Sequence, residues 1–137
     1  MRKLIALIPS VMLFLLARPA YAGRTEPQPV SCWFFRGEKL ELQQTCIYQS
    51  FSGAGFWAAN LQWEDGVKTR ISRGIASKDD RRCKDDGLSL DRVCGSYYNR
   101  HPQTLRRISD KDSKRMGINN QKTIFCVQVD RNSVCYL

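Results

Sequence analysis

Six cysteines at wide spacing limit the folds open to this chain of 137 residues more than any other feature. They are Cys32, Cys46, Cys83, Cys94, Cys126 and Cys135. The closest pairs have eight and ten residues between them, whereas structural zinc sites draw paired ligands from spacings of roughly two to four residues. We therefore expect three disulfides, no metal and no cofactor, in one small domain that folds in an oxidising compartment.

Residues 1–22 have the pattern of a secretory signal peptide. A basic start precedes an apolar run over 4–17, and Ala20-Tyr21-Ala22 has the small-x-small pattern of a cleavage site. The apolar run is shorter than the ~20 residues needed to span a bilayer, so we expect no transmembrane segment in the mature chain. Cleavage after Ala22 predicts a secreted or periplasmic protein.

The fold class follows from the pattern beyond this leader. Residues 23–29 are polar with two prolines and are expected to form a flexible N-terminal arm. Within 30–137, short runs of β-branched and aromatic residues alternate with Gly, Asp and Asn, which is typical of antiparallel strands. We predict a single all-β domain, a disulfide-stabilised meander closing toward a barrel or sandwich. A polar insertion at about 74–121 interrupts it.

One short helix is expected in this insertion, because Leu90, Val93, Cys94 and Tyr97 recur at helical spacing behind Ser89. His101-Pro102 would end it. A Cys83–Cys94 bond would then hold the segment, which has little apolar surface of its own.

Turn chemistry sets the registers of three expected hairpins. Gly37 favours a two-residue turn that places Phe35 opposite Leu40 and Trp33 opposite Leu42. A Cys32–Cys46 bond would then require a bulge, expected at Gln43-Gln44.

The other two hairpins follow the same logic. Gly66 as a left-handed turn residue places Leu61 opposite Thr69. A turn at Asp130-Arg131 places Cys126 opposite Cys135 and so favours that disulfide. The core expected from the three hairpins is Trp33, Phe35, Leu40, Leu42, Leu61, Trp63, Val67 and Ile71, with Phe125 or Ile124.

Two groups of residues are the candidates for ligand binding. The second hairpin would present a polar outer face, and the insertion carries several arginines. The candidates are Asn60, Gln62, Lys68, Arg70, Arg100, Arg106 and Arg107. Lys and Arg outnumber Asp and Glu by 22 to 13, although the signal peptide accounts for part of this excess. Exposed aromatics are sparse near the arginines, so nucleic acid is not expected and an anionic envelope polysaccharide is the preferred polyanion.

The sequence has few residues of the types that catalysis requires. His101 is the one histidine, and no G-x-S-x-G elbow surrounds a serine. A small ribonuclease-like hydrolase needs an acid, a carboxylate base and a phosphate-binding arginine, for which His101, Glu41 or Glu64, and Arg100 are the candidates. We expect non-catalytic binding of an unknown protein or polysaccharide, with a hydrolase as the alternative.

A second alternative is an enzyme inhibitor. The segment Ser50-Phe51-Ser52-Gly53-Ala54-Gly55-Phe56, followed by Trp63-Glu64-Asp65-Gly66, resembles the loop-then-strand motif of bacterial periplasmic lysozyme inhibitors, which are exported small β-barrels. The resemblance implies that Ser50 and Ser52 reach into a target cleft. The segment departs from that pattern at Gly55, where a basic residue is expected, and it comes early in the chain. A Gly-rich loop between strands is the simpler interpretation.

Overall fold

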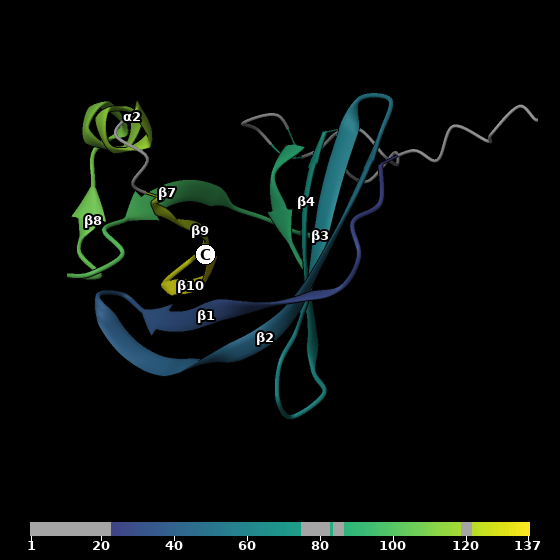
Figure 1. The fold of residues 1–137 in the computed structure, drawn as a ribbon, viewed down its shortest axis with the longest axis horizontal. Coiled ribbons are helices and arrows are strands. Elements are labelled where there is room, and N and C mark those ends of the chain that lie inside the picture. Colours follow the sequence, from purple (N-terminus) through teal and green to yellow (C-terminus); the bar gives the residue numbers. More distant parts are fainter. Residues whose placement is uncertain (1–22, 75–82, 84–86, 119–121) are drawn as a thin grey trace, which may run out of the picture.

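A computed structural model describes residues 23–74, 83, 87–118 and 122–137, so the predicted signal peptide lies outside the described part. All strand pairs are antiparallel and belong to one sheet, with the order β6-β5-β4-β3-β2-β1-β10-β9-β7-β8 (Figure 1). The elements are β1 (Gln28–Arg36), β2 (Lys39–Gly53), β3 (Phe56–Gln62), β4 (Lys68–Gly74), β5 (Ser89–Leu90), β6 (Val93–Cys94), β7 (Ser96–Arg100), β8 (Arg107–Ile108), α2 (Asp110–Ile118), β9 (Ile124–Val129) and β10 (Asn132–Tyr136). The prediction of a mainly antiparallel β domain with one short helix is confirmed.

The sheet curls into a half-barrel, as Figure 1 shows. β6 and β7 lie near opposite ends of the strand order, yet Gly95 alone separates them in the chain. β6 pairs with β5 and β7 pairs with β9, so the chain itself joins the two sides of the curl. A Cβ on Gly95 would lie 2.7 Å from the carbonyl oxygen of Gln128, which explains why glycine occupies the crossing point.

The inner face of the curl carries the main core. Its buried members are Cys32, Cys46, Leu61, Trp63, Ile71, Leu88, Leu90, Val127 and Val134. Because successive residues of a strand point to opposite faces, each strand contributes alternate side chains to this core. Full burial of each large aliphatic side chain contributes roughly 1.5–3 kcal/mol relative to exposure.

A second buried cluster lies on the opposite face of β1, β9 and β10. It contains Trp33, Phe35, Ile124, Cys126 and Cys135, with Tyr98 and Leu105 packed against it. β1 therefore serves two cores: Cys32 faces the inner one, while Trp33 and Phe35 face the second. This explains why its apolar run is continuous rather than alternating, as in strands buried on both faces.

The three expected disulfides are present as Cys32–Cys46, Cys83–Cys94 and Cys126–Cys135. Both pairs favoured from the sequence are thereby confirmed. The predicted registers of the second and third hairpins are also correct, with Leu61 opposite Thr69 and Cys126 opposite Cys135.

The first hairpin needs a correction. Phe35 lies opposite Leu40 as predicted, but Trp33 lies opposite Gln43 and not opposite Leu42. The register shifts between Phe34 and Phe35, closer to the turn than the predicted bulge at Gln43-Gln44. The shift puts Cys32 and Cys46 on one face, which allows their bond.

Three residues of the expected core are exposed instead: Leu40, Leu42 and Val67. Leu40 lies beside the β1–β2 turn, where little packs over it. Leu42 and Val67 lie at an open end of the half-barrel, where they line a cavity. The face of Val67 follows from alternation, but Leu42 lies opposite Phe34 and so occupies the other face from Trp33, because of the register shift in the first hairpin.

The helix expected from Ser89 to Tyr97 is wrong. That segment forms β5, β6 and the start of β7, because Asp91 and Arg92, with φ of 47° and 70°, make a tight turn between β5 and β6. The helix of the insertion is α2, which begins after Ser109. The Ser109 hydroxyl accepts the Asp112 amide at 3.1 Å and so caps the start of this helix.

The segment expected to be a flexible arm follows β2 instead. The Thr25 amide donates to the Ser50 carbonyl at 3.0 Å, and the Ser52 amide donates to Gly23 at 2.7 Å. β1 begins at Gln28. Within the described residues, no helix has the length and apolar character needed to cross a membrane.

Candidate functional site

The polar residues predicted on the second hairpin lie together on the outer face of β3 and β4. Asn60 pairs with Arg70, and Gln62 pairs with Lys68. All but the half-buried Asn60 are exposed. The predicted surface therefore exists, and its role in binding stays a prediction.

The three predicted arginines lie elsewhere, at the β7–β8 hairpin, which Figure 1 shows on the opposite side of the molecule from β4. Arg100 is 1% exposed. Its Nη1 lies 3.1 Å from Glu38 Oε2 and donates to the Leu105 carbonyl at 2.7 Å, and its guanidinium lies 3.8 Å from the Phe35 ring centroid. A ligand cannot reach this group, so we assign Arg100 a structural role in place of the expected binding role.

The neighbours of Arg100 are more accessible. Arg107 forms a 2.7 Å ion pair with Glu38 and lies over the Tyr98 ring, 3.9 Å from its centroid. Arg106 is exposed. The structure thus separates the seven predicted binding residues into two surfaces and a buried arginine.

The histidine of the hydrolase alternative stabilises a turn. His101 Nδ1 accepts the backbone amides of Gln103 at 3.1 Å and Thr104 at 3.3 Å. Among the described residues, the hydrogen bonds of this ring reach backbone amides only. The proposed partners Glu41 and Arg100 are in ion pairs of their own, Glu41 with Arg36 and Lys39, and Arg100 with Glu38.

The serines singled out by the inhibitor resemblance contact the N-terminal segment. The Ser50 hydroxyl lies 3.3 Å from the Thr25 hydroxyl, and the Ser52 hydroxyl donates to the Gly23 carbonyl at 3.2 Å. Both serines belong to β2, which continues to Gly53. The expected loop is therefore reduced to the tight β2–β3 turn.

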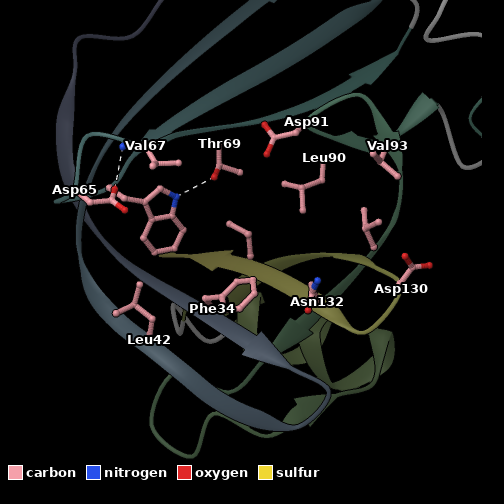
Figure 2. Close-up of a pocket in the computed structure, with 13 residues that line it drawn as sticks. Phe34, Leu42, Asp65, Val67, Thr69, Leu90, Asp91, Val93, Asp130 and Asn132 are labelled. Atoms are coloured by element: carbon pink, nitrogen blue, oxygen red, sulfur yellow. Dashed lines mark hydrogen bonds between the residues drawn. The ribbon is translucent and has the colours of Figure 1, made fainter.

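A cavity of about 430 Å³ lies at one open end of the half-barrel (Figure 2). Sequence reasoning did not predict it. Strands from all around the curl line it, together with three hairpin turns. Its lining residues are Phe34, Leu42, Trp63, Asp65, Val67, Thr69, Leu90, Asp91, Val93, Val129, Asp130, Asn132 and Val134.

Apolar side chains make up the walls of this cavity. The Trp63 indole forms part of the inner wall, held by its Nε1 donating to the Thr69 hydroxyl at 2.9 Å. At the mouth, Leu42, Val67 and Val93 are 43%, 56% and 53% exposed. Exposed apolar residues scattered singly need no explanation, but their clustering around one hollow is typical of a binding site.

Among the described residues, the charged residues of the lining are all aspartates, one from each of three turns. Asp65 lies in the β3–β4 turn, Asp91 in the β5–β6 turn and Asp130 in the β9–β10 turn. Figure 2 places them at separate points on the periphery of the lining residues. We call the hollow, with these three residues, the acid-rimmed cavity.

Two of these aspartates also shape their turns. Asp65 Oδ1 accepts the Val67 amide at 2.9 Å, and Asp91 Oδ1 accepts the Arg70 amide at 2.7 Å. Asp130 has a φ of 52°, a conformation that Asp and Asn tolerate better than most residues. The sequence predicted turns beside Asp65 and at Asp130 but a helix around Asp91, and the assembly of the three around one cavity depends on the sheet order.

The opposite end of the inner face is aromatic. A hollow there is lined by Trp57, Arg73, Phe125 and Tyr136. Tyr136 also packs against Tyr48, with ring centroids 5.1 Å apart. Burial, reinforced by the nearby Tyr48, raises the pKa of Tyr136 well above its ordinary value of 10.0.

This pKa shift predicts a loss of stability at alkaline pH. A folded-state pKa above the unfolded value favours the protonated phenol in the folded protein, so its contribution is complete below pH ~10 and declines above it. We expect the free energy of unfolding to fall less steeply above pH ~10 in Tyr136→Phe than in the unmodified protein. Urea titrations at several alkaline pH values would measure this, and identical slopes would contradict it.

Comparisons with known proteins add no relative: no family model matches the chain, and neither the curated proteins nor the solved structures contain a match.

Proposed function

We propose that this protein is an exported, non-catalytic binding module whose binding site is the acid-rimmed cavity, which takes up an apolar group. The observation that carries the proposal is the coincidence of a cavity of about 430 Å³ with a ring of exposed apolar residues at its mouth. Ligand sites of small molecules occupy roughly 300–1,000 Å³ and are frequent in the mouths of β-barrels.

Export is supported by independent features. The leader has the pattern of a signal peptide, and all six cysteines are paired in disulfides. Disulfides persist mainly in secreted and periplasmic proteins.

The lining also bears on the alternatives. Three carboxylates at the mouth repel anions, so the acid-rimmed cavity does not suit the anionic polysaccharide expected from the sequence. That ligand stays a prediction for the exposed face of β3 and β4. A hydrolase would require His101 to leave its backbone contacts and gain a carboxylate partner.

An uncharged fluorescent probe tests the proposal. N-phenyl-1-naphthylamine should bind the oxidised protein with enhanced emission, and Leu42→Asn should weaken its binding by about tenfold, since it removes apolar contact at the mouth. Ile47→Asn is the matched control, because Ile47 is also on β2 and is 42% exposed against 43% for Leu42, but does not line the cavity.

Two control variants define the result that would refute the proposal. Binding should be unchanged in Ile47→Asn and in His101→Ala. Equal loss in the two asparagine variants, or no binding to the unmodified protein, would refute the cavity as the site.

A further inference from the structure

We infer that the acid-rimmed cavity selects amphiphilic ligands with an apolar chain and a cationic head group. This inference rests on the proposed function, because it names the class of ligand for the same cavity. It depends on the sign of the charges at the mouth, which is opposite to that of the protein as a whole.

The charge of the lining differs in sign from the net charge of the chain. Lys and Arg outnumber Asp and Glu by 22 to 13 in the chain, yet the charged residues that line the cavity in the described part of the chain are all aspartates. In two of the turns the contrast is direct. Asp91 lines the cavity while the adjacent Arg92 does not, and Asp130 lines it while the adjacent Arg131 does not. Position within these turns thus places the acidic residue, and not the adjacent arginine, in the lining.

These carboxylates have capacity to accept a ligand. Asp65 and Asp91 each use one oxygen, Oδ1, for a backbone amide, which leaves Oδ2 as an acceptor. In the described part of the chain, none of the three aspartates forms an ion pair. A cation at the mouth would therefore gain carboxylate contacts without displacing an ion-pair partner from the described residues.

The buried walls of the cavity suit the apolar chain of such a ligand. Trp63, Leu90 and Val134 form buried walls, while the aspartates come from turns at the periphery. An amphiphile would place its chain against these walls and its head group at the acidic periphery. The volume of about 430 Å³ fits a small molecule, so the expected ligand is a small amphiphile and not a folded protein.

Three surfactants of equal chain length test the sign of the selectivity. Decyltrimethylammonium, decyl maltoside and decyl sulfate would each compete with N-phenyl-1-naphthylamine below their critical micelle concentrations. The net charge of +9 for the full sequence, which falls to +6 without Arg2, Lys3 and Arg18 of the predicted signal peptide, predicts that the sulfate binds best, whereas the acidic mouth predicts that the ammonium does. We expect decyltrimethylammonium to bind about tenfold tighter than decyl sulfate at low salt.

The preference should depend on the aspartates. The triple variant Asp65→Asn, Asp91→Asn, Asp130→Asn keeps the turn acceptors, because asparagine retains a side-chain carbonyl and tolerates positive φ. It should weaken decyltrimethylammonium by about tenfold, since each exposed charge contributes roughly twofold to threefold. Glu64→Gln is the matched control: it removes a charge from the same turn as Asp65 without altering the lining, and should have little effect.

The outcomes separate the two proposals. If the neutral probe binds and is lost in Leu42→Asn, but the surfactants bind without a cationic preference, the inference fails and the proposed function stands. If the neutral probe does not bind, the proposed function fails. A preference that survives in the triple variant would overturn the inference. So would tighter, aspartate-dependent binding of a short Leu/Lys peptide, which would assign the site to a protein partner.

Discussion

Replacing Arg100 with alanine is expected to lower the free energy of unfolding by about 3 kcal/mol. The side chain is 1% exposed and spans two parts of the fold. Its guanidinium stacks on Phe35 of β1, and its Nη1 donates to the Leu105 carbonyl beyond β7. Alanine would leave a cavity beside Phe35, and it would also remove the hydrogen bond to the Leu105 carbonyl.

Arg107→Ala is the matched control for this prediction. Arg107 binds the same carboxylate of Glu38 and also stacks on Tyr98, but its side chain is well exposed, as is that of Glu38. Solvent screening limits such a pair to about 1 kcal/mol or less. Urea denaturation of both variants would measure the difference, and equal losses would contradict a structural role for Arg100.

Arg100→Met separates packing from polar contacts. Methionine fills much of the buried volume but donates no hydrogen bond and carries no charge. A loss close to that of alanine would assign the stabilisation to the hydrogen bonds and the cation–π contact. Recovery by methionine would assign it to packing.

Most of the features predicted correctly from the sequence are fixed by local turn chemistry. Gly66 and the Asp130-Arg131 turn each set a register within a few residues, and the Cys126–Cys135 bond follows directly from the second. The helical spacing from Leu90 to Tyr97 misled because it extends over so short a segment that two tight strands fit it equally well.

The features missed depend on contacts between distant parts of the chain. Arg100 looked like a surface residue because its partners Gly37 and Glu38 are 63 and 62 residues away. Val67 looked like a core residue because alternation indicates a face and not whether that face is covered. Leu42 looked like one because the register shift that puts it opposite Phe34 was not predicted at that point. The acid-rimmed cavity combines both difficulties, since its lining comes from strands and turns throughout the sheet.

Removing the Cys32–Cys46 disulfide is expected to have the largest effect on stability, about 4 kcal/mol in the double alanine variant. The bond closes a loop with a sequence separation of 14 and lies within the inner core, where both residues are buried. Loop closure accounts for about 3 kcal/mol of the loss. The missing sulfur atoms, which leave a small cavity in the core, account for about 1 kcal/mol.

The Cys83–Cys94 bond provides the comparison that separates these two contributions. Its sequence separation of 11 gives nearly the same loop-closure entropy, but Cys94 is exposed, so its loss leaves little buried space. We expect the Cys83→Ala, Cys94→Ala variant to lose about 1 kcal/mol less than the Cys32→Ala, Cys46→Ala variant. Urea midpoints with their slopes would measure both. Equal losses would mean that burial of the Cys32–Cys46 sulfurs adds nothing beyond loop closure, and that the bulge in β1 and β2 serves the crosslink alone.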